Sequence, residues 1–355
     1  QLLDEMPEAN AIIGTGAWSR IMEVVEETLK GRRLVIAGTD DTIYDAKTPR
    51  LRTTPRYTAY VKIAEGCDHR CAFCAIPLIR GDFRSRTMED IITEVQHLAG
   101  SGVREVVLIA QDSANYGLDL YHRPMLAALL QALAKIDQIA WIRVLYSYPK
   151  YFSDELIEVF AQEPKIVKYV DLPLQHAHDA VLRAMNRPDT RAGIEKLIKK
   201  LRERIPDVSI RSTFIVGFPG ETDTHYQALR RFVEEQRFDK VGIFTYSEEE
   251  DTPAAQMPKK VSEEIMQERY HDLMSLQSKI SEEINIALES KVMDVLIEGR
   301  DAEQQGIAVG RSYREAPEVD GQIYIEGDTE SRVGDIVRVR LLQGFTYDIV
   351  GERVH

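Results

Sequence analysis

Cysteine is scarce in this sequence, which has three cysteines among 355 residues. The odd count argues against a disulfide framework, and thiols that must stay reduced for another purpose indicate the cytoplasm. Long apolar runs are also missing. Because no stretch of about 18 apolar residues occurs, no membrane span is predicted. These absences exclude a disulfide-rich secreted domain and a protein anchored by an apolar helix.

Basic residues are in deficit, with 45 Lys and Arg against 58 Asp and Glu, a net charge of −13 and a pI near 5.2. Such a protein is repelled by phosphate backbones and attracted to basic partners. The length predicts two or three domains with a large core.

The three cysteines lie close together, at Cys67, Cys71 and Cys74, in the spacing C-x3-C-x2-C. Three thiolates on one loop can ligate three irons of a cubane cluster and leave the fourth iron open. A structural zinc site is an alternative, but it needs a fourth ligand. His69 is the one local candidate, and it would have to fold back between two cysteines. A second alternative is three inert core cysteines.

The flanking residues are more specific than the spacing. The pattern Cys-x3-Cys-x-Phe-Cys, with Phe73, resembles the signature of the radical S-adenosylmethionine (SAM) superfamily. The wider string from Ala64 to Gly81, AEGCDHRCAFCAIPLIRG, resembles the methylthiotransferases, and the likeness continues through nearly the whole chain. The resemblance implies a 4Fe-4S cluster on the three cysteines, SAM on its open iron, and Phe73 against the adenine.

The resemblance also implies a reaction and its partners. Within the methylthiotransferases, the likeness is to the branch that adds a methylthio group to the β-carbon of an aspartate in ribosomal protein uS12. An electron donor such as flavodoxin is implied. No catalytic acid or base is assigned, because an unactivated C–H bond offers no acidic proton and a cofactor must do the chemistry.

Residues 1–35 are predicted to contain a strand ending at Gly14-Thr15-Gly16 and an amphipathic helix from Trp18 to Leu29. The glycine turn could cradle a phosphate or simply join strand to helix. The resemblance makes this segment a remnant of the family's amino-terminal domain, which supplies three further cysteines for a second 4Fe-4S cluster. We therefore expect a fragment that binds SAM but does not complete methylthiolation. Residues 36–56 are predicted to be a linker.

Residues 57–287 alternate β-branched runs with amphipathic windows, which predicts an α/β fold: a partial (β/α)6 TIM-like barrel of parallel strands, followed by a long helix. Chemistry in such barrels lies at the carboxyl ends of the strands, and the cysteine loop follows the first strand. The predicted strands are 59–64, 105–110, 141–146, 167–172, 209–216 and 240–244. The predicted helices are 87–99, 124–135, 153–162, 177–184, 190–204, 222–236 and 262–288, the last with a buried stripe of Ile265, Leu273, Leu276, Ile280 and Ile284.

Polar residues follow several predicted strands and are candidate cofactor contacts. The resemblance puts Gln111 and Gln175 against SAM, and Ser147 follows the third strand. Each could instead cap a helix or satisfy a loop. Arg211 could meet the SAM carboxylate or belong to an internal ion pair. Gly217 begins a turn that the superfamily uses near the adenine.

Three charged features near the same strand ends have structural alternatives. His176 and His178 could bind a metal but suit polar loop positions better. Glu221 and Thr222 are expected to begin the next helix, where the helix dipole favours an acid. The charged loop 247–255, with its run of acids, could meet a basic partner, although such runs usually form a solvated face.

Residues 288–355 are predicted to form five short strands in a small OB-like barrel, at 291–298, 306–311, 322–326, 336–341 and 348–353. The resemblance makes this a TRAM domain, whose relatives bind RNA. Acidic residues outnumber basic ones about two to one between Glu289 and Glu352, whereas a reader of nucleic acid should carry the opposite balance. A basic ribosomal protein is therefore favoured over tRNA.

Two other functions stay open. One is a methylthiotransferase acting on a modified adenosine of tRNA. The other is a non-catalytic, ribosome-associated protein whose cysteines hold zinc.

Overall fold

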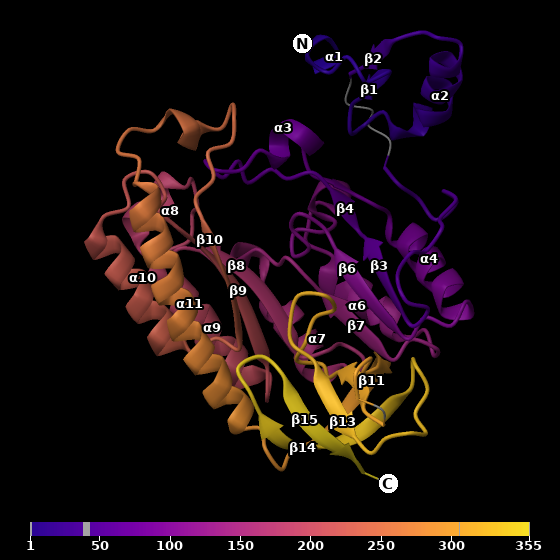
Figure 1. Cartoon of the computed structure of the whole chain (residues 1–355), viewed down its shortest axis with the longest axis vertical. Helices are drawn as coiled ribbons and strands as arrows, with labels where there is room; N and C mark the ends of the chain where they lie inside the picture. The colour runs from indigo at the N-terminus through magenta and orange to yellow at the C-terminus, as the bar shows by residue number, and fades with distance from the viewer. Residues whose placement is uncertain (1, 38–42, 305, 355) are drawn as a thin grey trace.

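The computed structural model describes residues 2–37, 43–304 and 306–354 (Figure 1). Along the chain come a small amino-terminal unit, a β/α barrel, a long helix and a closed β-barrel. Residues 38–42 of the predicted linker lie outside the described residues. No described helix combines the length and apolar character needed to cross a bilayer.

The six predicted barrel strands are confirmed, and all of their pairings are parallel. Their hydrogen bonds form two sheets of three strands, ordered β3-β6-β7 and β8-β9-β10, which meet at one isolated bridge between Ile142 and Ile166. The strands are β3 Thr58–Lys62, β6 Glu105–Ile109, β7 Trp141–Val144, β8 Tyr169–Gln175, β9 Ser209–Val216 and β10 Lys240–Thr245.

The helices cover the outer face of these strands, and several begin at a side-chain cap. Thr87, Ser153, Thr190 and Thr222 each accept a backbone N–H from the first turn of the helix that follows. The helices are α4 Met88–Gly100, α6 Leu126–Ala134, α7 Asp154–Gln162, α8 Asp179–Ala184, α9 Arg191–Arg204 and α10 Asp223–Gln236; shorter ones are α5 Leu118–Tyr121, η2 Pro149–Tyr151 and η3 Pro253–Gln256.

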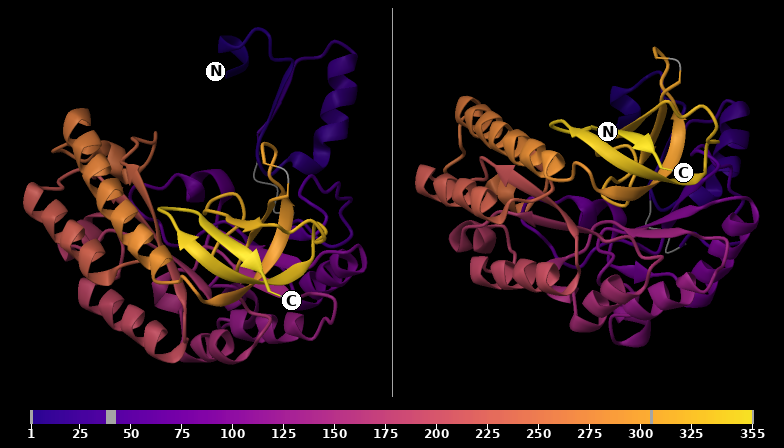
Figure 2. Two further views of the ribbon diagram at one scale, coloured as in Figure 1. Left: turned by 60° about the horizontal axis from the view of Figure 1, so that its bottom comes forward. Right: turned by 90° about the horizontal axis from the view of Figure 1, so that it is seen from below.

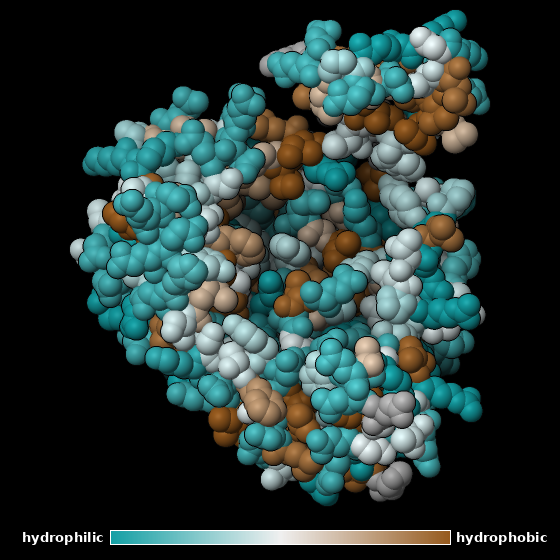
Figure 3. Space-filling view, viewed as in Figure 1, coloured by the Kyte–Doolittle hydropathy of each residue, from teal (hydrophilic) through white to brown (hydrophobic). Residues whose placement is uncertain are grey.

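Side chains of β9 show how the barrel separates its outer and inner faces. Phe214 is fully buried and packs against Phe232 and Phe238 on the helical side. Its neighbours Thr213 and Ile215 are partly exposed, as alternation along a strand requires for residues that face inward. The interior is therefore accessible, and Figure 3 shows a hollow in this face of the molecule.

The long helix α11, Glu263–Ile286, packs along β10. Leu273 and Ile280 of its predicted stripe are buried, but Ile265 is 42% exposed, so that part of the prediction is wrong. Met266 is buried instead, because its side chain packs where a β-carbon on Gly217 would lie.

The carboxyl-terminal residues form the predicted closed barrel of five strands, ordered β11-β12-β13-β15-β14. Val295, Ile297, Ile323 and Val339 fill its interior and are fully buried. Because the barrel is closed, it leaves no sheet edge unpaired. Its strands are β11 Val292–Arg300, β12 Ala308–Arg311, β13 Ile323–Glu326, β14 Ile336–Gly344 and β15 Ile349–Arg353.

This carboxyl-terminal barrel docks at the amino ends of the β/α barrel strands, away from the amino-terminal unit (Figures 1 and 2). Glu105, the first residue of β6, pairs with Arg311 of β12. Arg143 of β7 donates to the carbonyl of Tyr313 at 2.9 Å. Polar contacts between fully buried groups therefore fix the junction.

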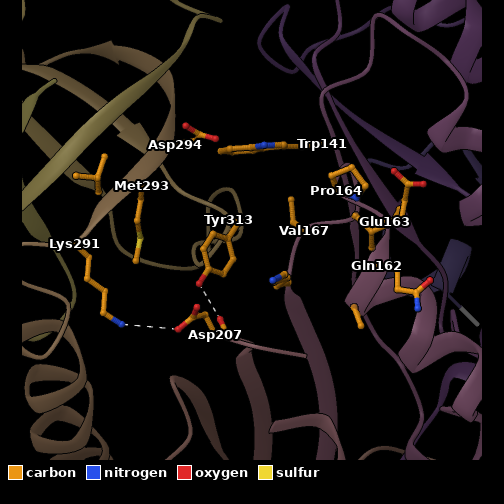
Figure 4. A pocket seen from close by; sticks show the side chains of 14 residues that line it. Trp141, Gln162, Glu163, Pro164, Val167, Asp207, Lys291, Met293, Asp294 and Tyr313 are labelled. Carbon is orange, nitrogen blue, oxygen red and sulfur yellow. Dashed lines mark hydrogen bonds and ion pairs between the residues drawn. The ribbon is translucent and has the colours of Figure 1, made fainter. Parts of the chain in front are cut away.

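A cavity of about 520 Å³ lies at this junction (Figure 4). Trp141 and Val167 form its β/α-barrel side, and Tyr313 and Lys291 come from the carboxyl-terminal segment. Tyr313 donates its hydroxyl hydrogen to the carbonyl of Asp207 at 2.8 Å. Tyr313 also packs against the apolar cluster that contains Trp141 and Val167. None of the predicted site residues lines the cavity.

The amino-terminal unit stands apart in Figure 1. The predicted strand and helix are present, and a second strand pairs in parallel with the first, from Leu34 to Ile36. This strand passes the predicted boundary at residue 35. The elements are α1 Leu2–Glu5, β1 Ala11–Ile13, η1 Trp18–Arg20, α2 Ile21–Leu29 and β2 Leu34–Ile36.

Candidate functional site

The cysteine loop leaves the carboxyl end of the first barrel strand through a short hairpin of β4, Ala64–Glu65, and β5, Arg84–Ser85. Gly66 has a φ of +80°, and a β-carbon there would lie 2.1 Å from the carbonyl oxygen of Asp82. Only glycine fits this entry. Cys67 donates its N–H to the carbonyl of Gly81 at 3.2 Å, which closes the loop behind α3, Ile76–Arg80.

All three cysteines are free and partly buried. Burial raises the pKa of each thiol, that of Cys67 to about 11, and the charges of Cys71 and Cys74 add to the rise at Cys67. The three thiols lie on one loop, just before α3. Thiolates in this setting need a cationic partner, which iron or another soft metal supplies.

His69 does not act as a spare ligand in this geometry. Its Nε2 lies 2.7 Å from Oδ2 of the buried Asp112, and its ring stacks on Tyr148 with centroids 3.7 Å apart. Asp112 also accepts the backbone N–H of Tyr148 at 3.1 Å. Across the described ranges, no three His, Cys, Asp or Glu side chains converge on a single ion, whereas the corners of a cubane are held by separate iron atoms.

Gln111 and Gln175 each place a buried amide oxygen with no hydrogen-bond partner among the described residues. Buried acceptors are rarely left unpaired. Gln175 ends β8 with a φ of +70°, and Gln111 follows β6, so both lie at carboxyl ends of strands. The two oxygens suit a ligand that donates hydroxyl or ammonium hydrogens, as SAM does.

Phe73 and Ser147 lie near the same strand ends. Phe73 is partly buried and packs against an apolar cluster that contains Ala72, Phe218 and Met266. Ser147 is buried, and its N–H donates to the carbonyl of Asp171 at 2.9 Å. The ring of Phe73 can therefore pack against a flat base. The hydrogen bond of Ser147 links β7 to β8, which are not paired by regular sheet hydrogen bonds.

Gly217 begins its turn with a φ of +78° and donates its N–H to Glu221 Oε2 at 3.0 Å. Glu221 also pairs with Arg269 of α11, Nη1 to Oε1, at 2.7 Å. Thr222 begins the helix as expected, as the cap of α10, which starts at Asp223. The expectation for Glu221 is wrong, because it lies before the cap. Glu221 instead fixes the turn from inside the protein.

Arg211 makes the internal ion pair that the sequence left open. Its Nη1 lies 3.1 Å from Oδ1 of the buried Asp171, whose Oδ2 accepts the N–H of Tyr146 at 3.0 Å. Burial would lower the pKa of Arg211, but the charge and hydrogen bond of Asp171, with the nearby Tyr169 and Asp320, together outweigh burial and raise it. Contact of Arg211 with the SAM carboxylate stays a prediction.

The two histidines after β8 have structural partners. His178 caps α8 by accepting the N–H of Ala180 at 3.2 Å, and His176 Nδ1 accepts the N–H of His178 at 2.9 Å. The Gly14-Thr15-Gly16 turn also has a structural partner, because the hydroxyl of Thr15 donates to the carbonyl of Ile79 at 2.7 Å. That contact joins the amino-terminal unit to α3.

Sequence reasoning missed the loop of residues 185–189, between α8 and α9. Met185 accepts the N–H of Ala72 at 2.9 Å, and Asn186 donates to the carbonyl of Arg70 at 2.8 Å. Arg187 follows directly and is buried. The only local signals were an Asn-Arg-Pro sequence and two helix ends, and neither indicates a partner more than 100 residues away.

The chain is similar to known proteins along most of its length. The chain matches the family model described as the radical SAM superfamily over residues 61–233 and the TRAM domain over residues 291–354. Among solved structures, coproporphyrinogen III oxidase (HemN) from Escherichia coli, described as a radical SAM enzyme, aligns over 81% of this chain and 67% of its own with a TM-score of 0.48 at 15% identity.

Similar curated proteins cover almost the whole chain. "Ribosomal protein uS12 methylthiotransferase RimO" of Caldanaerobacter subterraneus is 47% identical over 99% of this chain and 80% of its own length. The protein of the same name from Desulforamulus reducens is 49% identical over the same shares. At this identity and coverage, the chain belongs to the RimO family of radical SAM methylthiotransferases.

Proposed function

We propose that Cys67, Cys71 and Cys74 ligate three irons of a 4Fe-4S cluster and that SAM binds its open iron. The observation that carries the proposal is a loop of three partly buried thiols at the carboxyl ends of the barrel strands, beside two unpaired amide oxygens. When bound and reduced, the cluster supplies the electron that cleaves SAM to methionine and a radical able to take hydrogen from an unactivated carbon.

The residues of this chain bind SAM and orient it. Gln111 and Gln175 accept hydrogen bonds from SAM through their unpaired oxygens. Phe73 packs against the adenine, from the apolar cluster that it shares with Phe218. Glu221 and Arg269 hold the Gly217 turn in place, so the cofactor meets a fixed surface from which water is excluded.

The proposed substrate is an aspartate of ribosomal protein uS12, methylthiolated at its β-carbon. The names of the RimO relatives support it, and so does charge. A chain with a net charge of −13 attracts a basic ribosomal protein and repels tRNA. We propose a low-potential donor such as flavodoxin as the source of electrons, and the cytoplasm as the location.

The full reaction is proposed to need a second 4Fe-4S cluster that delivers sulfur. Because the three cysteines of this sequence are all assigned to the first cluster, ligands for a second must come from outside it. The chain as given is therefore proposed to bind and cleave SAM without completing methylthiolation.

Mass spectrometry of uS12 from cells with and without the full-length protein tests the substrate. The proposal predicts that one aspartate carries an added methylthio group only when the protein is present. An unmodified uS12, together with tRNA binding that weakens steeply with salt, would support the tRNA alternative instead.

A further inference from the structure

The loop of residues 185–189 forms hydrogen bonds with two residues of the cysteine loop. Met185 and Asn186 bond the backbones of Ala72 and Arg70, which flank Cys71 on either side. Arg187 follows directly. These hydrogen bonds fix the backbone of Arg187 relative to that of Cys71. They do not involve the side chain of Arg187 or of Cys71.

Arg187 is a buried cation, with only 4% of its surface exposed. Its Nη2 donates to the carbonyl of Pro173 at 3.0 Å and lies 3.2 Å from Asp189 Oδ2. Its guanidinium carbon lies 4.3 Å from the ring centroid of Tyr148. Packing and these contacts leave the planar group in one orientation.

One donor of this guanidinium is unused. Nε of Arg187 is buried and has no hydrogen-bond partner among the residues that the structure describes. A buried N–H is rarely left without an acceptor. The hydrogen bonds of Met185 and Asn186 to the residues on either side of Cys71 hold this guanidinium next to the cysteine loop.

We infer that Arg187 donates a hydrogen bond to a sulfur of the cluster held by Cys67, Cys71 and Cys74, and that this contact favours the reduced cluster. The inference rests on the proposed function. Reduction adds one electron from a low-potential donor and makes the cluster more negative by one charge. A fixed guanidinium stabilises that state more than the oxidised one, and hydrogen bonds to the sulfurs are a known determinant of cluster potential.

The test compares the anaerobically reconstituted wild-type chain with Arg187→Met and Arg187→Lys. Methionine keeps much of the packing on Tyr148 without charge or donors, and lysine keeps the charge without Nε. Arg183→Met is the matched control, because Arg183 is exposed one turn earlier on α8. Iron and sulfide content, the midpoint potential followed by EPR, and the unfolding of the metal-free chain are measured for each.

We expect Arg187→Met to bind iron and to disfavour reduction about tenfold, a shift of about 59 mV for one electron. Arg187→Lys should fall between it and the wild type, and Arg183→Met should match the wild type. A wild-type potential in Arg187→Met would overturn the inference. Loss of iron from both Arg187 variants with unchanged unfolding would also overturn it, since Arg187 would then hold the cluster rather than set its potential. If the wild-type chain itself bound no iron, the proposed function would fail instead.

Discussion

Glu105 and Arg311 form a buried ion pair that joins the β/α barrel to the carboxyl-terminal barrel, with Nη2 and Oε2 2.6 Å apart. Both side chains are at most 1% exposed, and Arg143 donates to the other oxygen of Glu105 at 2.9 Å. One carboxylate thus contacts two buried guanidinium groups from different domains, and Arg311 also pairs with Glu298 at 2.8 Å.

Glu105→Gln should lower the free energy of unfolding by about 3–5 kcal/mol, because it leaves buried positive charge uncompensated. Denaturant unfolding measures the loss. Glu326→Gln, at an exposed position of the carboxyl-terminal barrel, is the control and should change stability by about 0.5 kcal/mol or less. Equal stabilities for the two variants would show that the pair does not hold the junction.

The same carboxylate predicts a dependence on pH. Burial alone would raise the pKa of Glu105, but Arg311 and Arg143 outweigh it and lower the pKa from 4.5 to about 2. Because the folded pKa is the lower one, the stabilisation is complete above the unfolded pKa and is lost as the pH falls from about 4.5 toward 2. The stability gap between wild type and Glu105→Gln should therefore be constant near pH 7 and narrow below pH 4.5. A gap that stayed constant to pH 3 would contradict this assignment.

The unpaired oxygen of Gln111 predicts opposite effects on stability and binding. Gln111→Leu should leave the unfolding free energy of the metal-free chain unchanged or higher, since a buried acceptor without a partner is removed. SAM binding by the reconstituted chain should weaken about tenfold, or about 1.4 kcal/mol. Gln131→Leu, at an exposed position on α6, should alter neither. Unchanged SAM affinity in Gln111→Leu would remove Gln111 from the cofactor site.

Substitution of His69 distinguishes an iron–sulfur cluster from the zinc alternative. His69→Ala should keep the iron content of the wild type, because the imidazole is held by Asp112 and Tyr148. It should cost about 1–3 kcal/mol of stability by leaving the buried Asp112 Oδ2 without its partner. The exposed His97→Ala is the control. Loss of bound metal from His69→Ala alone would instead indicate that His69 is a ligand.

Much of the fold follows from local patterns. Apolar residues alternate along β9 and recur at helical spacing in α10, because one face of each element is buried. Such periodicity involves residues that are close in the sequence and can be read directly from it. The break between β7 and β8 could not be foreseen in this way. It is bridged by Asp171, whose side chain and carbonyl accept the N–H groups of Tyr146 and Ser147, and such long-range contacts leave no local pattern.

The candidate site likewise contains residues that local sequence predicts and residues that it does not. The cysteine loop is a contiguous motif and could be predicted. Arg187 could not, because its role depends on a partner in another loop. The rotation of α11 that buries Met266 and exposes Ile265 depends on the space beside Gly217, which helical periodicity does not describe.

Cleavage of SAM by the anaerobically reconstituted chain under dithionite tests the central claim most directly. With about four irons and four sulfides bound, the chain should convert SAM to methionine and 5′-deoxyadenosine in equal amounts, and Cys71→Ala should form neither product. Intact SAM in the presence of a full complement of iron, or a chain that holds zinc without iron or sulfide, would contradict the account.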